Sequence, residues 1–438
     1  MDPLTIGYIC VAALFIFLAL GVPVGVAMGV LGVAGMYVGF GEAFAFGQLR
    51  TLPFSVVNNY AFAVLPMFVL MGVLAESSGI TSQLFHAGEL WLRNRKGGLY
   101  QAVVVGSAIF AAVSGSTIVN AVVFTRLAFP HMIRFGYSRA LSIGSIAAAG
   151  SFAAMIPPSI TMVIYAIITE QSVGKLLIAG ALPGILTAVV YLMGISVMVR
   201  IRPSLAPDIK ELSTRAEKWS ALWGVSPVAL LIVLVLGGIY FGFFPPSAAG
   251  AIGAFGAFCI AVTRKWGQGS KWLTSSLRDA ASVSCIIFII LIGGLIFSRM
   301  LVVSGVIDGF VELVNTFAYS PLRFMIFISI MYIILGCFLD TTSMLVVTLP
   351  FVFPAVQQLD IDPIWFGIVL VKLIEISVIT PPVGINLFAV LGSVSGQAQF
   401  QDVVKGVLPF LLMEILVLLM LIAFPSIATW LPEQMIAS

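Results

Sequence analysis

Two short polar segments interrupt apolar stretches of this chain, and their oxygen atoms are suited to binding a cation. The first is Ser114-Gly115-Ser116-Thr117, followed by Asn120, and the second is Asp340-Thr341-Thr342-Ser343. Hydroxyl, carboxylate and carbonyl oxygens are ligands that hard cations such as Na⁺ prefer. Asp340 is an ionisable group within an apolar stretch, which makes it a functional candidate, although it could equally cap a following helix.

Two proline pairs, Pro157-Pro158 and Pro381-Pro382, break two other apolar stretches. Proline removes a backbone donor and clashes with the preceding turn, so carbonyl groups lose their helical partners. Such groups persist in lipid only where they line a cavity or bind a ligand. The sequence therefore predicts two Na⁺ sites. The first combines the first polar segment with backbone from Gly150 to Pro157, and the second combines the second segment with Thr380 to Pro382. The alternative is that these small residues only let helices pack closely.

Side chains near the breaks are candidates for holding an anion beside the cation, because helix N-termini carry a partial positive charge. Arg126 follows the first segment by about ten residues, or about 15 Å of helix, and could bind an anion or extend to the headgroups. Glu375 could contact the ligand or pair with Lys372 on the same helix. The remaining substrate candidates flank the proline pairs: Ser159, Thr161, Thr380 and Asn386.

A spacing of 224 residues relates several motifs in the first half of the chain to motifs in the second half. The offset between the proline pairs is 381 − 157 = 224, and the offset between Phe129-Pro130 and Phe353-Pro354 is the same, 353 − 129 = 224. Gly29 and Gly32 likewise match Gly253 and Gly256. Repeated halves with interrupted apolar helices are typical of secondary transporters whose site lies at the repeat interface.

Composition places the chain in a membrane. Of its 438 residues, 61% are hydrophobic and 9% are charged, and the mean hydropathy is +1.15. A water-soluble chain could not cover its surface with so few polar groups, so phospholipid must surround it. Two histidines, four isolated cysteines and the lack of a Gly-rich phosphate loop argue against a zinc or haem centre and against ATP. We expect no organic cofactor, no nucleic-acid partner and no enzyme activity, since neither histidine is placed for a catalytic pair.

The apolar pattern predicts an all-α polytopic membrane protein with about ten transmembrane helices and two re-entrant hairpins in two inverted repeats. The hairpins are expected at 98–127 and 321–354, and the broken helices at 138–168 and 363–395. The first repeat is expected at 1–200, a cytoplasmic linker at 201–220 and the second repeat at 221–438. The ten apolar stretches lie near 4–21, 24–40, 59–77, 138–168, 176–199, 221–243, 247–263, 276–299, 363–395 and 403–430.

Basic residues favour one orientation of these spans. With the N-terminus outside, the inner loops collect fifteen Lys and Arg residues and the outer loops four. This bias is the one that the positive-inside rule predicts. The first hairpin then enters from the cytoplasm and the second from outside, and both termini are expected in the periplasm.

The motifs resemble those of the large membrane subunit of tripartite ATP-independent periplasmic (TRAP) transporters. The similarity rests on SGSTIVN, GYSRA, IPPS and LPG in the first half and GCFLDTT, IDPIWFG and ITPPVGINLF in the second. The resemblance implies an elevator-type member of the ion-transporter superfamily that imports a small organic anion with Na⁺ across the bacterial inner membrane. It also implies ligand roles for Ser114, Gly115, Ser116 and Asp340.

The resemblance further implies two partners, a periplasmic substrate-binding protein and a small four-span membrane subunit as a separate chain. The run VNAVVFTR differs from the Ala-rich form associated with sialic-acid members, which leaves carboxylates and sulfonates as substrate classes. The alternative is a stand-alone Na⁺/dicarboxylate or citrate symporter of a related ion-transporter family.

Overall fold

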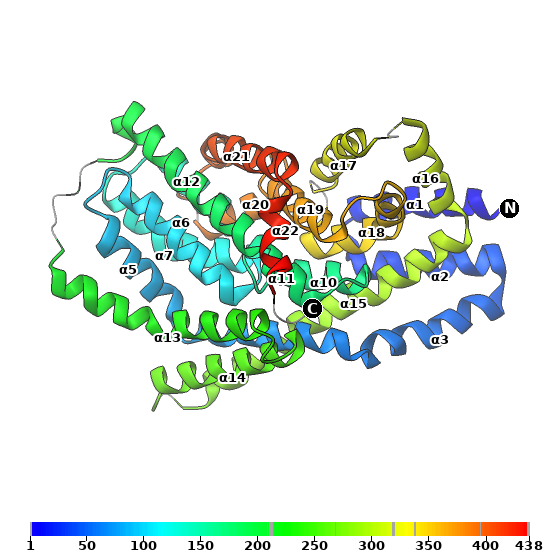
Figure 1. Cartoon of the computed structure of the whole chain (residues 1–438), viewed down its shortest axis with the longest axis horizontal. Coiled ribbons are helices and arrows are strands. Elements are labelled where there is room, and N and C mark those ends of the chain that lie inside the picture. Colours follow the sequence, from blue (N-terminus) through cyan, green and yellow to red (C-terminus); the bar gives the residue numbers. More distant parts are fainter. Residues whose placement is uncertain are drawn as a thin grey trace.

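The computed structural model describes residues 2–207, 209, 213–267, 269–317, 320–336, 339–394 and 396–435. These residues form helices and no strand (Figure 1). The first half contains α1 (Pro3–Ala19), α2 (Val24–Phe40), α3 (Glu42–Asn58), η1 (Tyr60–Ala63), α4 (Val64–Ser77), α5 (Ile80–Leu92), α6 (Gly98–Ser114), α7 (Thr117–Arg134), α8 (Arg139–Gly150), α9 (Phe152–Met155), α10 (Ile160–Ile168), α11 (Val173–Ala179), α12 (Ala181–Ile201) and η2 (Pro203–Leu205). The second half contains α13 (Arg215–Tyr240), α14 (Pro246–Arg264), α15 (Lys271–Val303), α16 (Val306–Phe317), α17 (Pro321–Leu335), α18 (Thr341–Gln358), α19 (Pro363–Val378), α20 (Ile385–Ser393), α21 (Phe400–Ala423) and α22 (Ser426–Glu433).

The predicted all-helical membrane class is confirmed, because the described residues include seven helical segments that are long and apolar enough to cross a bilayer. α1 and α2 have 17 residues each, which corresponds to about 25 Å of helix. The expected total of ten crossings therefore stays a prediction. No helix was predicted between 40 and 59, where the structure has α3.

The hairpin ends differ from the predicted ones. The helices at the positions of the predicted hairpins are α6 and α7 for the first and α17 and α18 for the second, and α7 and α18 continue to Arg134 and Gln358 instead of ending at 127 and 354. The prediction ended these arms near Pro130 and Pro354, but both prolines lie inside their helices. Proline is tolerated within helices at membrane depth, where neighbouring groups satisfy the freed carbonyls.

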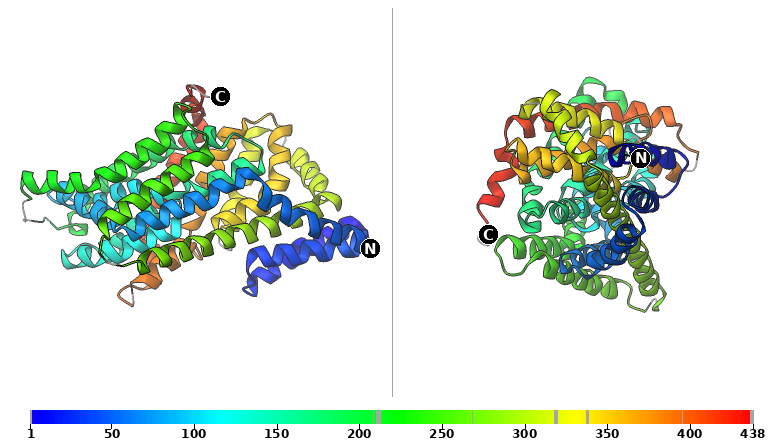
Figure 2. Two further views of the ribbon diagram at one scale, coloured as in Figure 1. Left: turned by 90° about the horizontal axis from the view of Figure 1, so that it is seen from below. Right: turned by 90° about the vertical axis from the view of Figure 1, so that its right-hand side faces the viewer.

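Helix boundaries recur at the spacing found in the sequence. α7 and α18 start at Thr117 and Thr341 and end at Arg134 and Gln358, which gives 341 − 117 = 224 and 358 − 134 = 224. The starts of α8 and α19 have the same offset, 363 − 139 = 224. The segment α3–η1–α4 corresponds by this offset to the single helix α15, which at 33 residues and about 50 Å runs along much of the molecule (Figure 2).

Packing between the halves is reciprocal. α2 packs along α15, and α14, the counterpart of α2, packs along α4. In the same way α10 contacts α18 and α20 contacts α7. Glycines allow the close approach: a Cβ on Gly25 would lie 2.8 Å from the Ile289 carbonyl oxygen, and one on Gly253 would lie 2.4 Å from Met71 Sδ. Each half therefore completes the packing of the other.

The closest backbone approach of this kind joins α8 and α21, and it provides a stability prediction. A Cβ on Gly406 would lie 1.8 Å from the Ala140 carbonyl oxygen. Gly406→Ala must push the two helices apart, so we expect a loss at or above the upper end of the ~1–3 kcal/mol that overpacking costs. Thermal melting in detergent measures this loss. The control is Gly392→Ala in α20, where a Cβ meets nothing within 4 Å; equal melting of both variants would contradict the prediction.

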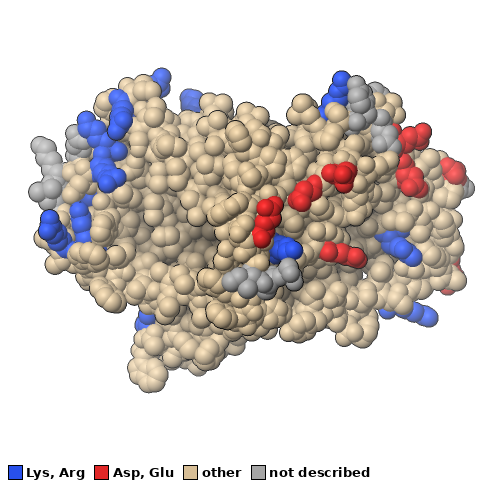
Figure 3. Space-filling model, in the orientation of Figure 1, with Lys and Arg blue, Asp and Glu red and all other residues tan. Residues whose placement is uncertain are grey.

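Basic side chains gather at one end of the molecule. On the face shown in Figure 3, Lys and Arg cluster at the left end, where α5, α12 and α13 have termini, and Asp and Glu lie towards the right half. The basic residues at these termini are Arg93, Arg95, Lys96, Arg200, Arg202, Arg215 and Lys218. Other Lys and Arg side chains lie in the right half of the same face, so basic residues are concentrated at the left end but not confined to it.

Candidate functional site

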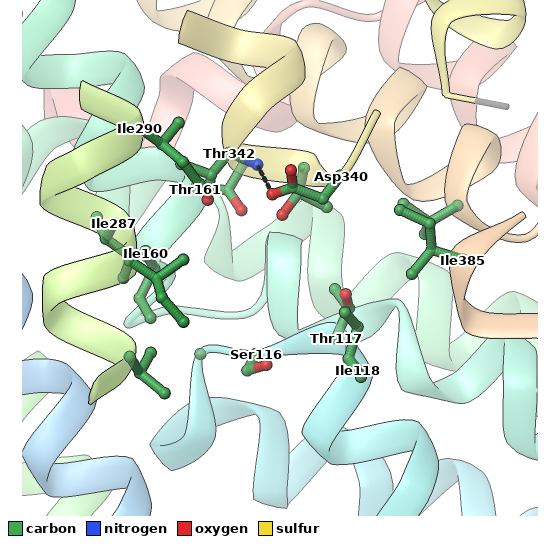
Figure 4. A pocket seen from close by; sticks show the side chains of 15 residues that line it. Ser116, Thr117, Ile118, Ile160, Thr161, Ile287, Ile290, Asp340, Thr342 and Ile385 are labelled. Carbon is green, nitrogen blue, oxygen red and sulfur yellow. Dashed lines mark hydrogen bonds between the residues drawn. The ribbon is translucent and has the colours of Figure 1, made fainter. Parts of the chain in front are cut away.

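The two polar segments meet at one cavity of about 210 Å³ (Figure 4). Ser116 and Thr117 lie on one side, and Asp340 and Thr342 lie on the other. Four apolar residues of α15 form a further wall, namely Val283, Ile286, Ile287 and Ile290. The rest of the lining is Gly115, Ile118, Ile160, Thr161, Thr341, Val378 and Ile385.

Ser116 and Asp340 lie in the two polar segments, which form the tips of the two predicted hairpins. Each caps the helix that follows it. Ser116 Oγ accepts a hydrogen bond from Val119 N at 3.4 Å at the start of α7. Asp340 Oδ2 accepts from Thr342 N at 3.1 Å and from Ser343 N at 3.4 Å at the start of α18, and the Ser343 hydroxyl donates to Asp340 Oδ1. Ser116 and Asp340 are themselves related by the repeat offset. A carboxylate can accept about four hydrogen bonds, so capping leaves Asp340 capacity for a cation.

Four helices begin at this cavity. α7 and α18 start at the hairpin tips, and α10 and α20 start after the two proline pairs, with Ile160 and Ile385 in the lining. The first N–H groups of a helix lack intrahelical partners, and its N-terminus carries partial positive charge. Four such ends directed at one cavity favour an anionic ligand.

Backbone carbonyls of the breaks approach the same region. Gly115 has a φ of +61°, and a Cβ there would lie 3.3 Å from the Pro158 carbonyl oxygen, so the first tip contacts the first break. At the second break, a Cβ on Gly384 would lie 2.8 Å from the Val378 oxygen and 3.0 Å from the Thr380 oxygen. Both proline pairs have a cis peptide bond. The contacts at Gly115 and Val378 place carbonyl oxygens of both breaks near the cavity lining, and oxygen atoms of this kind suit Na⁺.

Ser114 adds a further oxygen at the first tip. The residue is 8% exposed, and its buried Oγ has no hydrogen-bond partner within the described part of the chain. A buried hydroxyl without a partner costs free energy unless something binds it. The residues present at the first tip therefore fit a cation.

Gly115→Ala tests whether the close contact between Gly115 and the Pro158 carbonyl is needed for Na⁺ binding. We expect the variant to lose Na⁺-dependent stabilisation, because the new methyl group would lie 3.3 Å from both the Pro158 oxygen and Ile160 Cγ1. The positive φ adds a backbone cost of about 1–2 kcal/mol. Gly79→Ala is the matched control, since Gly79 has a φ of +76° but open space around it. The measurement is the melting temperature against Na⁺ concentration; similar Na⁺ shifts in both variants would show that the tip tolerates the methyl group.

Some predicted ligands have hydrogen-bond or packing partners within the protein. Asn120 is fully buried, its Nδ2 donates to the Ser107 carbonyl at 3.2 Å, and its Oδ1 accepts from Ser107 Oγ at 2.8 Å, so it joins the two arms of the first hairpin. A Cβ on Gly150 would lie 2.6 Å from Ala121 Cβ, which identifies close packing of α8 on α7. Ser159 caps α10 by accepting from Met162 N at 3.3 Å and donating to the Ala154 oxygen at 2.5 Å.

Other candidates lie outside the cavity lining. Arg126 is exposed on α7. Glu375 belongs to a buried network with Lys372. Asn386 is fully buried next to Ile385, and its two amide atoms have no hydrogen-bond partner among the described residues. The lining also omits Pro157, Thr380 and Pro382, although the Thr380 carbonyl faces Gly384 as described above.

Sequence reasoning missed the wall formed by α15. Its residues at 283, 286, 287 and 290 have the i, i+3, i+4, i+7 spacing of one helix face. That signal was present, but an apolar stripe in a transmembrane helix does not distinguish a cavity wall from contact with lipid.

Comparison with known proteins identifies the family. A family described as the DctM component of tripartite ATP-independent periplasmic transporters matches residues 11–427. The C4-dicarboxylate TRAP transporter large permease of Pseudomonas aeruginosa is 31% identical over 87% of this chain and 88% of its own length. The isethionate TRAP transporter permease DctMQ of Oleidesulfovibrio alaskensis is 28% identical over 98% of this chain and 66% of its own length.

The fold is also similar to that of a solved membrane transporter. The YdaH transporter of Alcanivorax borkumensis superimposes with a TM-score of 0.63 at 17% identity, covering 89% of this chain and 90% of that one. With the family match over nearly the whole sequence, this chain belongs to the large permease (DctM) family of tripartite ATP-independent periplasmic transporters.

Proposed function

We propose that this chain is the permease subunit of a Na⁺-coupled importer of a small organic anion, working with a periplasmic substrate-binding protein and a separate small membrane subunit in the bacterial inner membrane. The observation that carries the proposal is the cavity where four helix N-termini and the Asp340 carboxylate meet. The helix ends suit the anion, and the tip and break oxygens suit Na⁺. Each ligand partly neutralises the charge of the other.

The size of the cavity supports a small substrate. Its volume of about 210 Å³ lies below the ~300–1,000 Å³ of pockets for drug-sized ligands. The similar proteins described above are named for a C4-dicarboxylate and for isethionate, which are a carboxylate and a sulfonate. We therefore propose a compact carboxylate or sulfonate as the substrate of this chain.

An elevator movement in two inverted repeats fits the arrangement of the helices. The reciprocal contacts of α2 with α15 and of α14 with α4 are those expected of two copies related by a two-fold axis. The hairpin tips face an apolar α15 surface, across which a transport domain could slide without breaking polar contacts. Rigid-body movement around a site near the bilayer midplane would provide alternating access.

Uptake in proteoliposomes tests this function. The chain is reconstituted with the small membrane subunit and the substrate-binding protein proposed as its partners, and uptake of labelled dicarboxylates and of isethionate is followed with an inward Na⁺ gradient. We expect uptake that requires both the gradient and the binding protein. Uptake by this chain alone would instead support the stand-alone symporter, and uptake driven by ATP without a Na⁺ gradient would contradict secondary transport.

Cysteine labelling tests the orientation. In a variant without native cysteines, Lys405→Cys near the start of α21 should react with a membrane-impermeant thiol reagent only from the cytoplasm, and Arg50→Cys in α3 only from the periplasm. Both positions are exposed. Lys210, predicted in the cytoplasmic linker, lies outside the described residues. Labelling of the two positions from the same side, or from the opposite sides to those stated, would refute the topology.

A further inference from the structure

A cluster of ionisable side chains lies inside the helix bundle, outside the cavity. Lys372 and Glu375 belong to α19 and Glu414 belongs to α21, and the three residues are 0% exposed. Ionisable groups at membrane depth are costly, and they are functional candidates by default. Neither Lys372 nor Glu414 has a role in the anion and cation site proposed above.

Hydrogen bonds join the cluster across three helices. Lys372 Nζ donates to Glu375 Oε2 at 2.5 Å, to Glu414 Oε2 at 2.7 Å and to Thr187 Oγ1 of α12 at 2.9 Å. The Tyr191 hydroxyl of α12 donates to Glu414 Oε1 at 2.5 Å. The ammonium group thus uses its three donors, and both oxygens of Glu414 accept hydrogen bonds. Glu375 Oε1 is buried and has no partner among the described residues.

The cluster lies close to both broken helices. The ring of Phe152 in α9, just before the first proline pair, is 5.1 Å from the Tyr191 ring. α19 leads into the second proline pair, and Val378 in the cavity lining follows Glu375 by three residues, or about 4.5 Å of helix. A change of charge in the cluster therefore occurs beside both breaks.

The charges in the cluster do not balance if both carboxyl groups are ionised. Two carboxylates and one ammonium leave a net charge of −1, and an uncompensated buried charge costs several kcal/mol. The helices packed against α19 offer no further cation at the cluster: Lys175 of α11, Arg323 of α17 and Lys405 of α21 lie near the starts of their helices and reach the surface. The other ionisable groups of these helices have surroundings or partners outside the cluster. Asp402 and Glu433 reach the surface, Tyr165 donates to the Pro363 oxygen, and Tyr332 pairs with Thr348.

We propose that Glu375 and Glu414 share one proton, so that this cluster is an intramembrane proton-binding site separate from the cavity. One carboxyl group is ionised and pairs with Lys372, and the other is a neutral acid. Glu375 Oε1 is the position for the added proton, because the other three carboxyl oxygens accept hydrogen bonds. Loss of the proton leaves one negative charge in the bundle beside both breaks.

Infrared spectroscopy of the purified full-length chain in an ester-free detergent detects this proton through the carbonyl stretch of a protonated carboxylic acid. At neutral pH we expect this band in the wild-type protein. Glu375→Gln and Glu414→Gln should each abolish it, because the remaining carboxylate then pairs with Lys372. Glu42→Gln on the exposed face of α3 is the matched control and should retain the band.

Two outcomes overturn the proposal. A wild-type protein without the band carries both groups ionised, and this measurement needs no variant to fold. A band that survives in either buried Gln variant belongs to another group. Melting provides a second measurement: the folded protein holds a proton that an unfolded carboxyl group releases at neutral pH, so the wild-type melting temperature should fall as pH rises. In Glu375→Gln this fall should become smaller; an unchanged pH dependence would also contradict proton sharing.

Discussion

Asp340→Asn is expected to weaken Na⁺ binding by at least about tenfold, or about 1.4 kcal/mol, while the protein still folds. The substitution removes the one carboxylate among the described residues that line the cavity. Asn caps helix N-termini about as well as Asp, so the start of α18 should remain intact. The measurement is a titration of Na⁺-dependent stabilisation, with uptake against Na⁺ concentration as the second readout.

A pair of alanine variants separates ligation from capping. Asp362 caps α19 by accepting from Trp365 N at 2.6 Å, but it is exposed and outside the cavity lining. Asp340→Ala and Asp362→Ala should each lose about 1 kcal/mol of stability with the cap. Only Asp340→Ala should alter the Na⁺ titration. If Asp340→Asn and Asp340→Ala both titrate like the wild type, the carboxylate is only a cap.

The sequence was sufficient to predict that the two polar segments and the two proline breaks occupy equivalent positions in the two halves of the chain. Their common offset related Ser116 to Asp340 before any contact was known, and the structure brings these residues to one cavity. A repeat with helix breaks restricts where polar backbone can lie, because lipid does not tolerate it elsewhere. Gly115, Ser116 and Thr117, which the sequence assigned to the first polar segment, also line this cavity.

The contacts made by single side chains could not be read in the same way. Asn120 lies one helical turn after the first tip, yet its amide faces Ser107 on the neighbouring arm. The spacing along α19 suggested an ion pair between Glu375 and Lys372, and the structure contains it. The second carboxylate that contacts Lys372 belongs to Glu414 on another helix. Spacing along one helix shows which residues share a face, whereas the partner across an interface depends on how helices cross.

Lys372→Met is expected to destabilise the protein by about 3–5 kcal/mol, the cost of removing one partner from a buried ion pair. Methionine has a similar length, so little packing is lost, but Glu375 and Glu414 then face each other without a cation. At least one of them must bind an extra proton, which is unfavourable at neutral pH. Lys175→Met at the partly exposed start of α11 is the control, and thermal melting in detergent measures the difference.

Second substitutions distinguish charge from shape as the cause of this loss. If the charge imbalance is responsible, Lys372→Met combined with Glu375→Gln or with Glu414→Gln should recover most of the stability, since one neutral acid then remains. If the ammonium group is needed mainly to organise the three helices, neither double variant recovers, because Thr187 and the remaining carboxyl group lose their common donor in both. Recovery should also shrink at acidic pH, where the extra proton in Lys372→Met binds at little cost. A loss that is independent of pH and persists in both double variants would therefore assign Lys372 to helix packing and not to charge balance.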